Sequence, residues 1–252
     1  MNPTDNESWP EFGRYFVGFV HKYQWYFFLL IITLVVLGFF IKKLAGDEWA
    51  WNRLQFLIDA YQEKVFKKFS DDPRHFHRVT LFQYQKFRWR LGTRPGRFEN
   101  KLFHKIWPYK KESHPLSGWL VPVLRSGHTT QKASSVFLCN KDHAVAEGIA
   151  GMIFIRSGTT VTQPLPVPSQ SAGKKEIKKY CTESSITIDR YYQMFRNGQP
   201  PPATIGGFPI EKNGKLWGVL VLDSTSETGV DTSSIDDYSI LISLIGQILE
   251  RT

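Results

Sequence analysis

The sequence predicts an α+β domain that follows a single N-terminal transmembrane helix. Three observations carry this prediction. The run Trp25–Ile41 contains no charged residue and, with its flanks, has about the 20 residues that a bilayer core requires. Further along, apolar and polar residues alternate with period two, and two strand-like segments are joined through Asn213-Gly214. Other segments repeat apolar residues at intervals of three and four, which is typical of helices packed on one face.

The apolar run has the flanks of a membrane span. Aromatic residues stand at its entry, beginning with Tyr23, and Lys42 and Lys43 follow it. We therefore predict an N-terminal segment over residues 1–22 and a transmembrane helix over residues 23–43. Because the basic excess follows the span, we expect a single-pass membrane protein with its N-terminus outside and its domain in the cytoplasm.

Composition limits the chemistry. The net charge of the 252-residue chain is +9, which favours an anionic partner such as lipid or nucleotide. Cys139 and Cys181 are the two cysteines, and neither belongs to a CxxC pattern. A disulfide framework is unsupported, and no metal site has the required ligand spacing. The sequence also contains no nucleophile or phosphate-loop motif, so we expect no enzyme activity.

Residues 44–72 are predicted to form a juxtamembrane helix that ends before Pro73. Apolar residues within Glu48–Phe69 are spaced like a short heptad seam. Two alternatives are open: the seam packs on the chain's own domain, or it pairs with a second copy and carries a signal between membrane and domain. The seam consists of Trp51, Leu54, Ile58, Tyr61 and Val65.

The remaining residues, 73–252, are predicted to form one domain. Strands are expected over Arg78–Leu91 and in the segments that begin at Gly118 and Ser134. The first two are separated by a basic insertion over residues 92–115.

The second half of the domain begins with a predicted helix over Glu147–Gly158, closed by Gly158. A strand is expected over Thr160–Val167, and helical segments are expected between Lys174 and Phe195. The strands Thr204–Ile210 and Lys215–Asp223 form the predicted hairpin, since Asn-Gly tolerates positive φ. A capped amphipathic helix is predicted from Ser233 onward.

Two of these segments together resemble the GAF domain family. Ala146–Thr162 is similar to the family's Gly-x-Gly-Ile-Ala-Gly helix, and the final hairpin with its following helix has the family's order and separation. The resemblance covers roughly residues 48–252 of the chain. It implies an antiparallel sheet of five or six strands with helices on both sides, and a homodimer made by the first and last helices.

The resemblance also implies a small-ligand pocket over one face of the sheet. Ile235, Asp236 and Asp237 depart from the motif of the family's cyclic-nucleotide subset, so that binding mode is not expected. Cys181 is followed by Thr182 rather than histidine, so no bilin is expected, and the cofactor is unknown. The pocket candidates are Phe137, Cys139, Tyr180, Tyr191, Arg196, Phe208 and Asp223.

A basic stretch from Arg74 to Lys111 contains eleven Lys and Arg residues against the single acid Glu99, a balance of +10. Three readings are open: a solvated surface, contact with anionic membrane lipid, or contact with a nucleotide or nucleic acid. The candidate contact residues are Lys86, Arg88, Arg90, Arg94, Arg97, Lys101, Lys105, Lys110 and Lys111.

These features predict a membrane-anchored, GAF-like sensor that binds a small cytoplasmic ligand and signals through its membrane helix or a separate output protein. One alternative is a membrane effector triggered by an anionic nucleotide, as in bacterial defence systems. Another is a GAF-fold scaffold without a ligand. A GAF-like methionine sulfoxide reductase would need Cys139 as its reactive residue.

Overall fold

The computed structural model describes residues 11–45, 48–85, 118–128, 136–140, 145–169, 171–196 and 198–250. The chain forms two compact units, Met1–Gly46 and Asp47–Thr252.

The first unit consists of α1 (Glu11–Lys22) and α2 (Gln24–Ala45). Phe19 contacts the rings of Tyr23 and Phe27, with ring centroids 4.8 and 6.0 Å apart, so aromatic packing joins the two helices. Within the described residues, no helix taken singly reaches the length and apolarity of a membrane span. Helix α1 and the Gln24–Phe39 part of α2 reach it as a pair, bent by 70°.

The second unit is built on one antiparallel sheet of seven strands in the order β4-β3-β2-β1-β7-β6-β5. The longest strands, β1, β2, β6 and β7, form its centre. The strands are β1 (His77–Gln85), β2 (Trp119–Ser126), β3 (Phe137–Asn140), β4 (Val145–Ala146), β5 (Thr160–Val161), β6 (Thr204–Lys212) and β7 (Lys215–Ser224).

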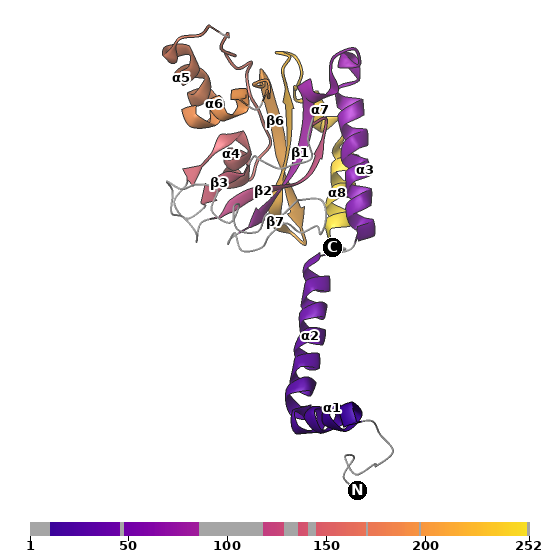
Figure 1. Cartoon of the computed structure of the whole chain (residues 1–252). Coiled ribbons are helices and arrows are strands. Elements are labelled where there is room, and N and C mark those ends of the chain that lie inside the picture. Colours follow the sequence, from indigo (N-terminus) through magenta and orange to yellow (C-terminus); the bar gives the residue numbers. More distant parts are fainter. Residues whose placement is uncertain are drawn as a thin grey trace. The chain divides into compact units, whose positions relative to one another are not determined.

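Helices cover both faces of the sheet. Figure 1 shows α3, α7 and α8 on one side and α4, α5 and α6 on the other. This confirms the predicted α+β architecture with helices on both sides. The helices are α3 (Glu48–Val65), α4 (Gly148–Arg156), α5 (Lys174–Glu183), α6 (Ile188–Arg196), α7 (Ser233–Asp236) and α8 (Ser239–Glu250), with short 3-10 helices η1 (Lys67–Phe69) and η2 (Arg74–Phe76).

The larger core lies between the sheet and the pair α3 and α8. All five residues of the predicted seam in α3 are buried there, against β1, β2, β7 and α8. Burying one such aliphatic side chain contributes about 1.5–3 kcal/mol. Tyr61 also donates a hydrogen bond to the Ser234 carbonyl at 2.6 Å. The seam therefore packs on its own domain, which is the first of the two alternatives.

A second core lies on the opposite face, beneath α4. Ile153 and Phe154 of α4 pack against Phe82 of β1 and Val219 of β7. The Tyr84 ring stacks on Phe154 with centroids 4.4 Å apart. Side chains of one strand alternate between the two faces, so β1 serves both cores at once.

The hairpin prediction is confirmed. Strands β6 and β7 pair from Thr204–Ser224 to Lys212–Lys215, and both turn residues have positive φ, 52° at Asn213 and 67° at Gly214. The two strands make the most extensive pairing in the sheet that the structure describes.

Three local predictions are wrong. Ser157 rather than Gly158 adopts the left-handed conformation that ends α4, with φ of 53°. The strand expected over Thr160–Val167 stops at Val161, because the prolines that follow cannot donate to a ladder. Thr232 rather than a serine is the N-cap of α7 and makes no side-chain cap bond, while Asp231 before it accepts hydrogen bonds from the amide and hydroxyl of Ser234.

Candidate ligand-binding site

A cavity of about 100 Å³ lies between the sheet and helices α4, α5 and α6. Its floor is the face of the sheet opposite α3. The floor residues come from β1, β2 and β7 and are Arg78, Thr80, Phe82, Arg125, Val221 and Asp223. The walls are formed by His128, Phe137, Gly148, Ile149, Ala150, Tyr180, Ser184, Ile186, Arg190, Met194, Gln199, Pro202 and Ile205.

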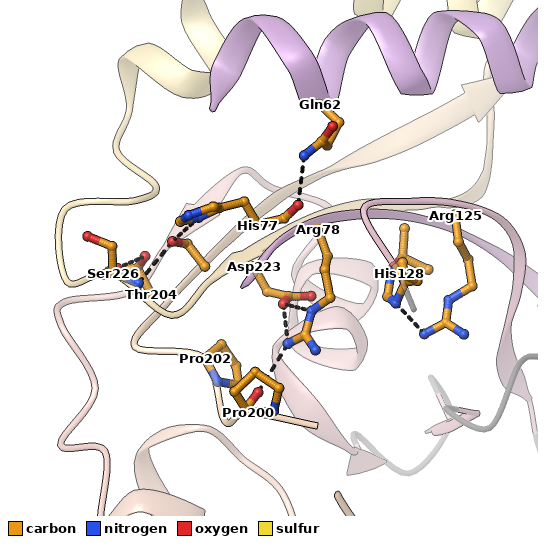
Figure 2. A network of polar contacts seen from close by, with 12 residues as sticks. Gln62, His77, Arg78, Arg125, His128, Pro200, Pro202, Thr204, Asp223 and Ser226 are labelled. Carbon is orange, nitrogen blue, oxygen red and sulfur yellow. Dashed lines mark hydrogen bonds and ion pairs between the residues drawn. The ribbon is translucent and has the colours of Figure 1, made fainter. Parts of the chain in front are cut away.

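The floor carries an ion pair between neighbouring strands. The register of β1 and β7 places Arg78 directly opposite Asp223, and the guanidinium donates to the carboxylate. Only 8% of the Arg78 side chain and 16% of the Asp223 side chain is exposed. The Arg78 Nη2 group also donates to the Pro200 carbonyl at 3.4 Å, which holds the segment after α6 against the floor (Figure 2). Burial of Arg78 is therefore compensated by a carboxylate and a carbonyl.

A second arginine lies on the neighbouring strand pair. Arg125 of β2 stands opposite Thr80 of β1, and His128 joins the two side chains. Arg125 Nη2 donates to His128 Nδ1 at 2.7 Å (Figure 2). His128 Nε2 lies 2.8 Å from Thr80 Oγ1. Because arginine only donates, Nδ1 must be the acceptor, and the ring proton then belongs on Nε2. The imidazole is thus neutral and orients Arg125.

The third arginine comes from the helical wall. Arg190 of α6 is buried, with its guanidinium 5.5 Å from the centroid of the Phe137 ring. Its backbone amide donates to Thr187 Oγ1 at 3.2 Å, which caps the start of α6 and fixes the position of Arg190. Three guanidinium groups on three different elements therefore face one cavity.

The three arginines affect one another electrostatically. Burial lowers the pKa of Arg125 to about 10, and the positive charges of Arg78 and Arg190 act in the same direction while Asp223 opposes them. Burial, together with the charges of Arg125 and Arg78, lowers the pKa of His128 to about 2. Among the described lining residues, three guanidinium groups thus face a single carboxylate, an excess of positive charge.

The helical wall has a small core of its own. Tyr180 and Tyr191 pack with ring centroids 5.7 Å apart, beside Leu165, Ile177 and Cys181. Tyr180 donates from its hydroxyl to the Pro202 carbonyl at 3.1 Å, and burial raises its pKa. Ile205 is shared with the core beneath α4. A wall with so small a core is expected to open at lower free energy than the sheet.

Gly148 is needed where α4 begins against the cavity. Its φ is +67°, and a Cβ there would lie 2.9 Å from the Phe137 ring. Its amide donates to the Ser185 carbonyl at 2.6 Å, which ties α4 to the end of α5. The glycine of the GAF-like motif therefore permits both the turn and the close approach of Phe137.

The structure brings some of the predicted pocket residues together. Phe137, Tyr180 and Asp223 line the cavity. Cys139 is buried between β3 and α4, with its thiol 3.8 Å from the Gly151 carbonyl, and Tyr191 belongs to the core of the wall. Neither lines the cavity.

The two remaining candidates lie elsewhere. Arg196 is exposed, with Nε 3.4 Å from the Tyr192 carbonyl, and it does not line the cavity. Phe208 faces the core beneath α3 and α8, because its position along β6 places it on the other face of the sheet. The nine basic residues predicted to contact lipid or nucleotide (Lys86, Arg88, Arg90, Arg94, Arg97, Lys101, Lys105, Lys110 and Lys111) lie outside the described residues.

Sequence reasoning missed the three arginines and the histidine of the cavity: Arg78, Arg125, Arg190 and His128. Arg78 was counted only within the basic stretch. Arg125 had a usable signal, since it lies in the apolar segment Trp119–Ser126, where a charge at a strand position needs a buried partner. Arg190 had no such sequence signal, because it is one of several charged residues on an amphipathic helix.

A polar network joins the cavity to α3 through the sheet. His77 and Ser224, which flank Arg78 and Asp223, face the opposite side, where Nδ1 of His77 lies 2.9 Å from Ser224 Oγ. Gln62 of α3 donates to the His77 carbonyl at 2.9 Å (Figure 2). Adjacent residue pairs of β1 and β7 therefore face the cavity on one side of the sheet and α3 on the other.

No protein-family model matches the sequence, and no curated protein matches it. Solved structures that match part of this chain include the chromophore-binding domain of the bacteriophytochrome RpBphP3 from R. palustris, at 12% identity and a TM-score of 0.34, over 80% of this chain and 57% of that one. The nlh2 GAF domain of A. aeolicus in an inactive state is 15% identical, with a TM-score of 0.34, over 80% of this chain and 91% of that one.

A mutated NreA protein of S. aureus, described as altered in its nitrate-binding site, is 12% identical with a TM-score of 0.32, over 71% of this chain and 91% of that one. The chain thus spans little more than half of the bacteriophytochrome domain. The domain itself is α+β, with an antiparallel sheet flanked by helices.

The buried His128 predicts a specific pH dependence of stability. Its pKa is lowered in the folded state, so below about pH 6.5 the unfolded chain binds a proton that the folded chain does not. Acidification from pH 7.5 to 5.5 should therefore lower the unfolding temperature of the wild type more than that of His128→Gln, which keeps an acceptor and a donor. Thermal unfolding of the full chain at both pH values measures this, with His75→Gln as the control. Equal losses in wild type and His128→Gln would refute the assignment.

Proposed function

We propose that this protein is a membrane-tethered sensor whose GAF-like domain binds a small anionic molecule in the cavity between the sheet and helices α4 to α6. One observation carries the proposal: Arg78, Arg125 and Arg190 converge on this cavity with Asp223 as the one carboxylate among its described lining residues. Concave sites with a few polar groups among apolar walls are where small ligands bind.

The electrostatics favour an anion over a neutral ligand. Burying a guanidinium group is costly, and burial is the main reason why the pKa of Arg125 is lowered, with a smaller contribution from repulsion by Arg78 and Arg190. An anion in the cavity reduces that repulsion and supplies acceptors for charge-assisted hydrogen bonds. Arginine suits this role because its planar group binds carboxylate or phosphate oxygens in pairs.

The membrane tether is supported by the composition of α2. The part Gln24–Phe39 is too short to qualify as a span by itself, whereas the whole helix has 22 residues, a rise of about 33 Å, against a bilayer core of about 30 Å. Its residues from Trp25 to Ile41 carry no charge, and the described apolar side chains of α2 are exposed within the unit. We propose that α2 crosses the bilayer and that α1, bent away by 70°, lies in the interface with Phe12, Phe16 and Phe19 toward the lipid.

Signal transfer follows from the polar network. A ligand that draws Arg78 away from Asp223 changes the contact between β1 and β7. The adjacent residue of β1, His77, accepts a hydrogen bond from Gln62 of α3, so the change is passed to α3. Helix α3 follows the hydrophobic helix in the sequence, so the output is directed toward the membrane end of the chain. Hydrogen exchange of the α3 amides, measured with and without anion, tests this route.

Removing one cavity arginine should weaken anion binding. Arg190→Gln and Arg125→Gln each remove a charged donor, and loss of such a bond corresponds to about 10- to 100-fold in affinity. The measurement is the shift in unfolding temperature of the full chain on titration with small carboxylates and phosphates, in a buffer free of other oxyanions. Arg156→Gln, an exposed arginine at the end of α4, is the matched control.

The wild type and Arg156→Gln should be stabilised by at least one of these anions, and the two cavity variants much less so. An identical response of all four proteins would show that the anion acts elsewhere on the chain and would remove the cavity from the proposal.

The tether predicts tight membrane association. The full chain should stay in the membrane pellet after washing with alkaline carbonate. Leu30→Lys combined with Leu34→Lys should release it, because each lysine at the centre of a span costs about 2.5–3.5 kcal/mol. Val167→Lys, which places a lysine at an exposed apolar position of the domain, should stay in the pellet. Release of the wild type by carbonate would contradict the tether.

A further inference from the structure

We infer that the outer face of α6 pairs with the same face of a second copy of this chain, with the two helices antiparallel. The inference goes beyond the proposed function, because it assigns a contact between copies that neither the cavity nor its ligand requires. It rests on the proposed function in one respect, since the tether confines the copies to one plane and so brings them together.

Helix α6 carries an apolar stripe on its outer face. Ile188, Tyr192 and Phe195 are spaced by four and three residues, so they lie on one face of the helix. Their exposed fractions are 43%, 41% and 52%. The other face is buried, where Tyr191 packs on Tyr180 of α5 and the helix borders the cavity. Single exposed apolar side chains are common on protein surfaces, whereas a contiguous stripe marks an interaction surface.

The charges beside this stripe complement themselves. Asp189, in the first turn, and Arg196, in the last turn, are the exposed charged residues of α6. They are seven residues apart, so they lie on the same side of the stripe. Within the described part of the chain, neither side chain forms an ion pair. Each end of the helix therefore offers a charge that the opposite end of a second α6 can neutralise.

An antiparallel pair of α6 helices satisfies both the stripe and the charges. With a two-fold axis near Tyr192, this ring meets its own copy, and Ile188 lies against Phe195 of the partner subunit. The same symmetry brings Asp189 opposite Arg196 of the partner subunit, and it does so twice. A parallel pair would place like charges at the same level along the two helices, so the charges select the antiparallel arrangement.

This contact differs from the homodimer that the GAF resemblance implies. That homodimer would use the first and last helices of the domain, which are α3 and α8. Figure 1 shows α6 beside α5, on the opposite side of the sheet from α3 and α8. Variants on the two sides of the sheet can therefore tell the two contacts apart.

The position of α6 disfavours lipid as the occupant of the stripe. Helix α3 begins at Glu48, the end that connects to the hydrophobic helix, and Gln62 lies 14 residues later, about 21 Å along the helix. Gln62 contacts His77, at the end of the sheet where Pro200, just after α6, is also held. The start of α3 and helix α6 therefore lie toward different ends of the sheet.

The size of the face predicts weak pairing that depends on the tether. A helix of nine residues is about 13.5 Å long, so its outer face is smaller than the roughly 800 Å² that each partner buries in a standard interface. Copies held in one membrane meet at a much higher effective concentration than copies in dilute solution. Pairing is therefore expected in vesicles.

The test is cross-linking of the full chain in phosphatidylcholine vesicles with a short bis-maleimide. The native Cys139 and Cys181 are buried, so the wild type should not be cross-linked. Tyr192→Cys should give a cross-linked dimer, because this position meets itself at the two-fold axis. Ile188→Cys and Phe195→Cys should be cross-linked to each other in vesicles that contain both, and much less when either is alone.

The charges are tested in the Tyr192→Cys background. Asp189→Arg should lower the cross-linked yield about 10-fold, because two attractive pairs become repulsive. Arg196→Asp should have the same effect, and the two changes combined should restore most of the yield, because the ion pairs form again with their charges exchanged. Asp71→Arg, at an exposed position outside α6, is the matched control and should leave the yield unchanged.

Several results would overturn the inference and leave ligand binding in the cavity standing. Failure of the combined charge exchange to restore cross-linking would refute the ion pairs. Loss of cross-linking in Ile240→Lys, an exposed position of α8, but not in Asp189→Arg would place the contact between copies on the other side of the sheet. Absence of cross-linking in Tyr192→Cys would remove the second copy from the stripe, and protection of this cysteine from a water-soluble maleimide would then assign the stripe to lipid. A chain that does not stay with the vesicles would overturn the tether, and this inference with it.

Discussion

The ion pair between Arg78 and Asp223 is the interaction on which the rest of the site depends. It joins the two central strands of the sheet, it is nearly fully buried, and it supplies the one carboxylate among the described residues that face three arginines. Without it, the floor of the cavity would carry uncompensated positive charge in a low-dielectric setting, at a cost of several kcal/mol. Through the Pro200 carbonyl it also holds the chain between α6 and β6 in place.

Because side chains alternate between the two faces of a strand, the residues next to this ion pair face the α3 side of the sheet. Arg78 and Asp223 face the cavity, so their neighbours His77 and Ser224 face the opposite side, beneath α3. The stacking of His77 on Phe69, at 4.5 Å between ring centroids, and the hydrogen bond from Gln62 anchor α3 to the same strand ends. The residues that face the cavity and the residues that support α3 are therefore neighbours in the same two strands.

The architecture could be predicted from the sequence, because it depends on local and repetitive signals. The apolar spacing of α3, the Asn213-Gly214 turn and the glycine at position 148 each reflect a backbone or packing requirement that is visible in a short segment. The charged site could not be predicted in the same way. Arg78, Arg125 and Arg190 lie far apart in the sequence, and only strand register and the packing of α6 bring them together. Phe208 shows the opposite kind of error. It was predicted to line the pocket because of the strand it lies on, but its side chain faces the core beneath α3 and α8.

The most direct test of this electrostatic account is the thermal unfolding of Asp223→Asn, with and without a saturating small anion. Asparagine keeps the shape of the side chain but removes the charge, so three arginines then face the cavity with no described carboxylate. The account predicts that the variant unfolds at a lower temperature than the wild type and that the anion raises its unfolding temperature by more than that of the wild type. Equal stability of the two proteins, with equal gains from the anion, would contradict it.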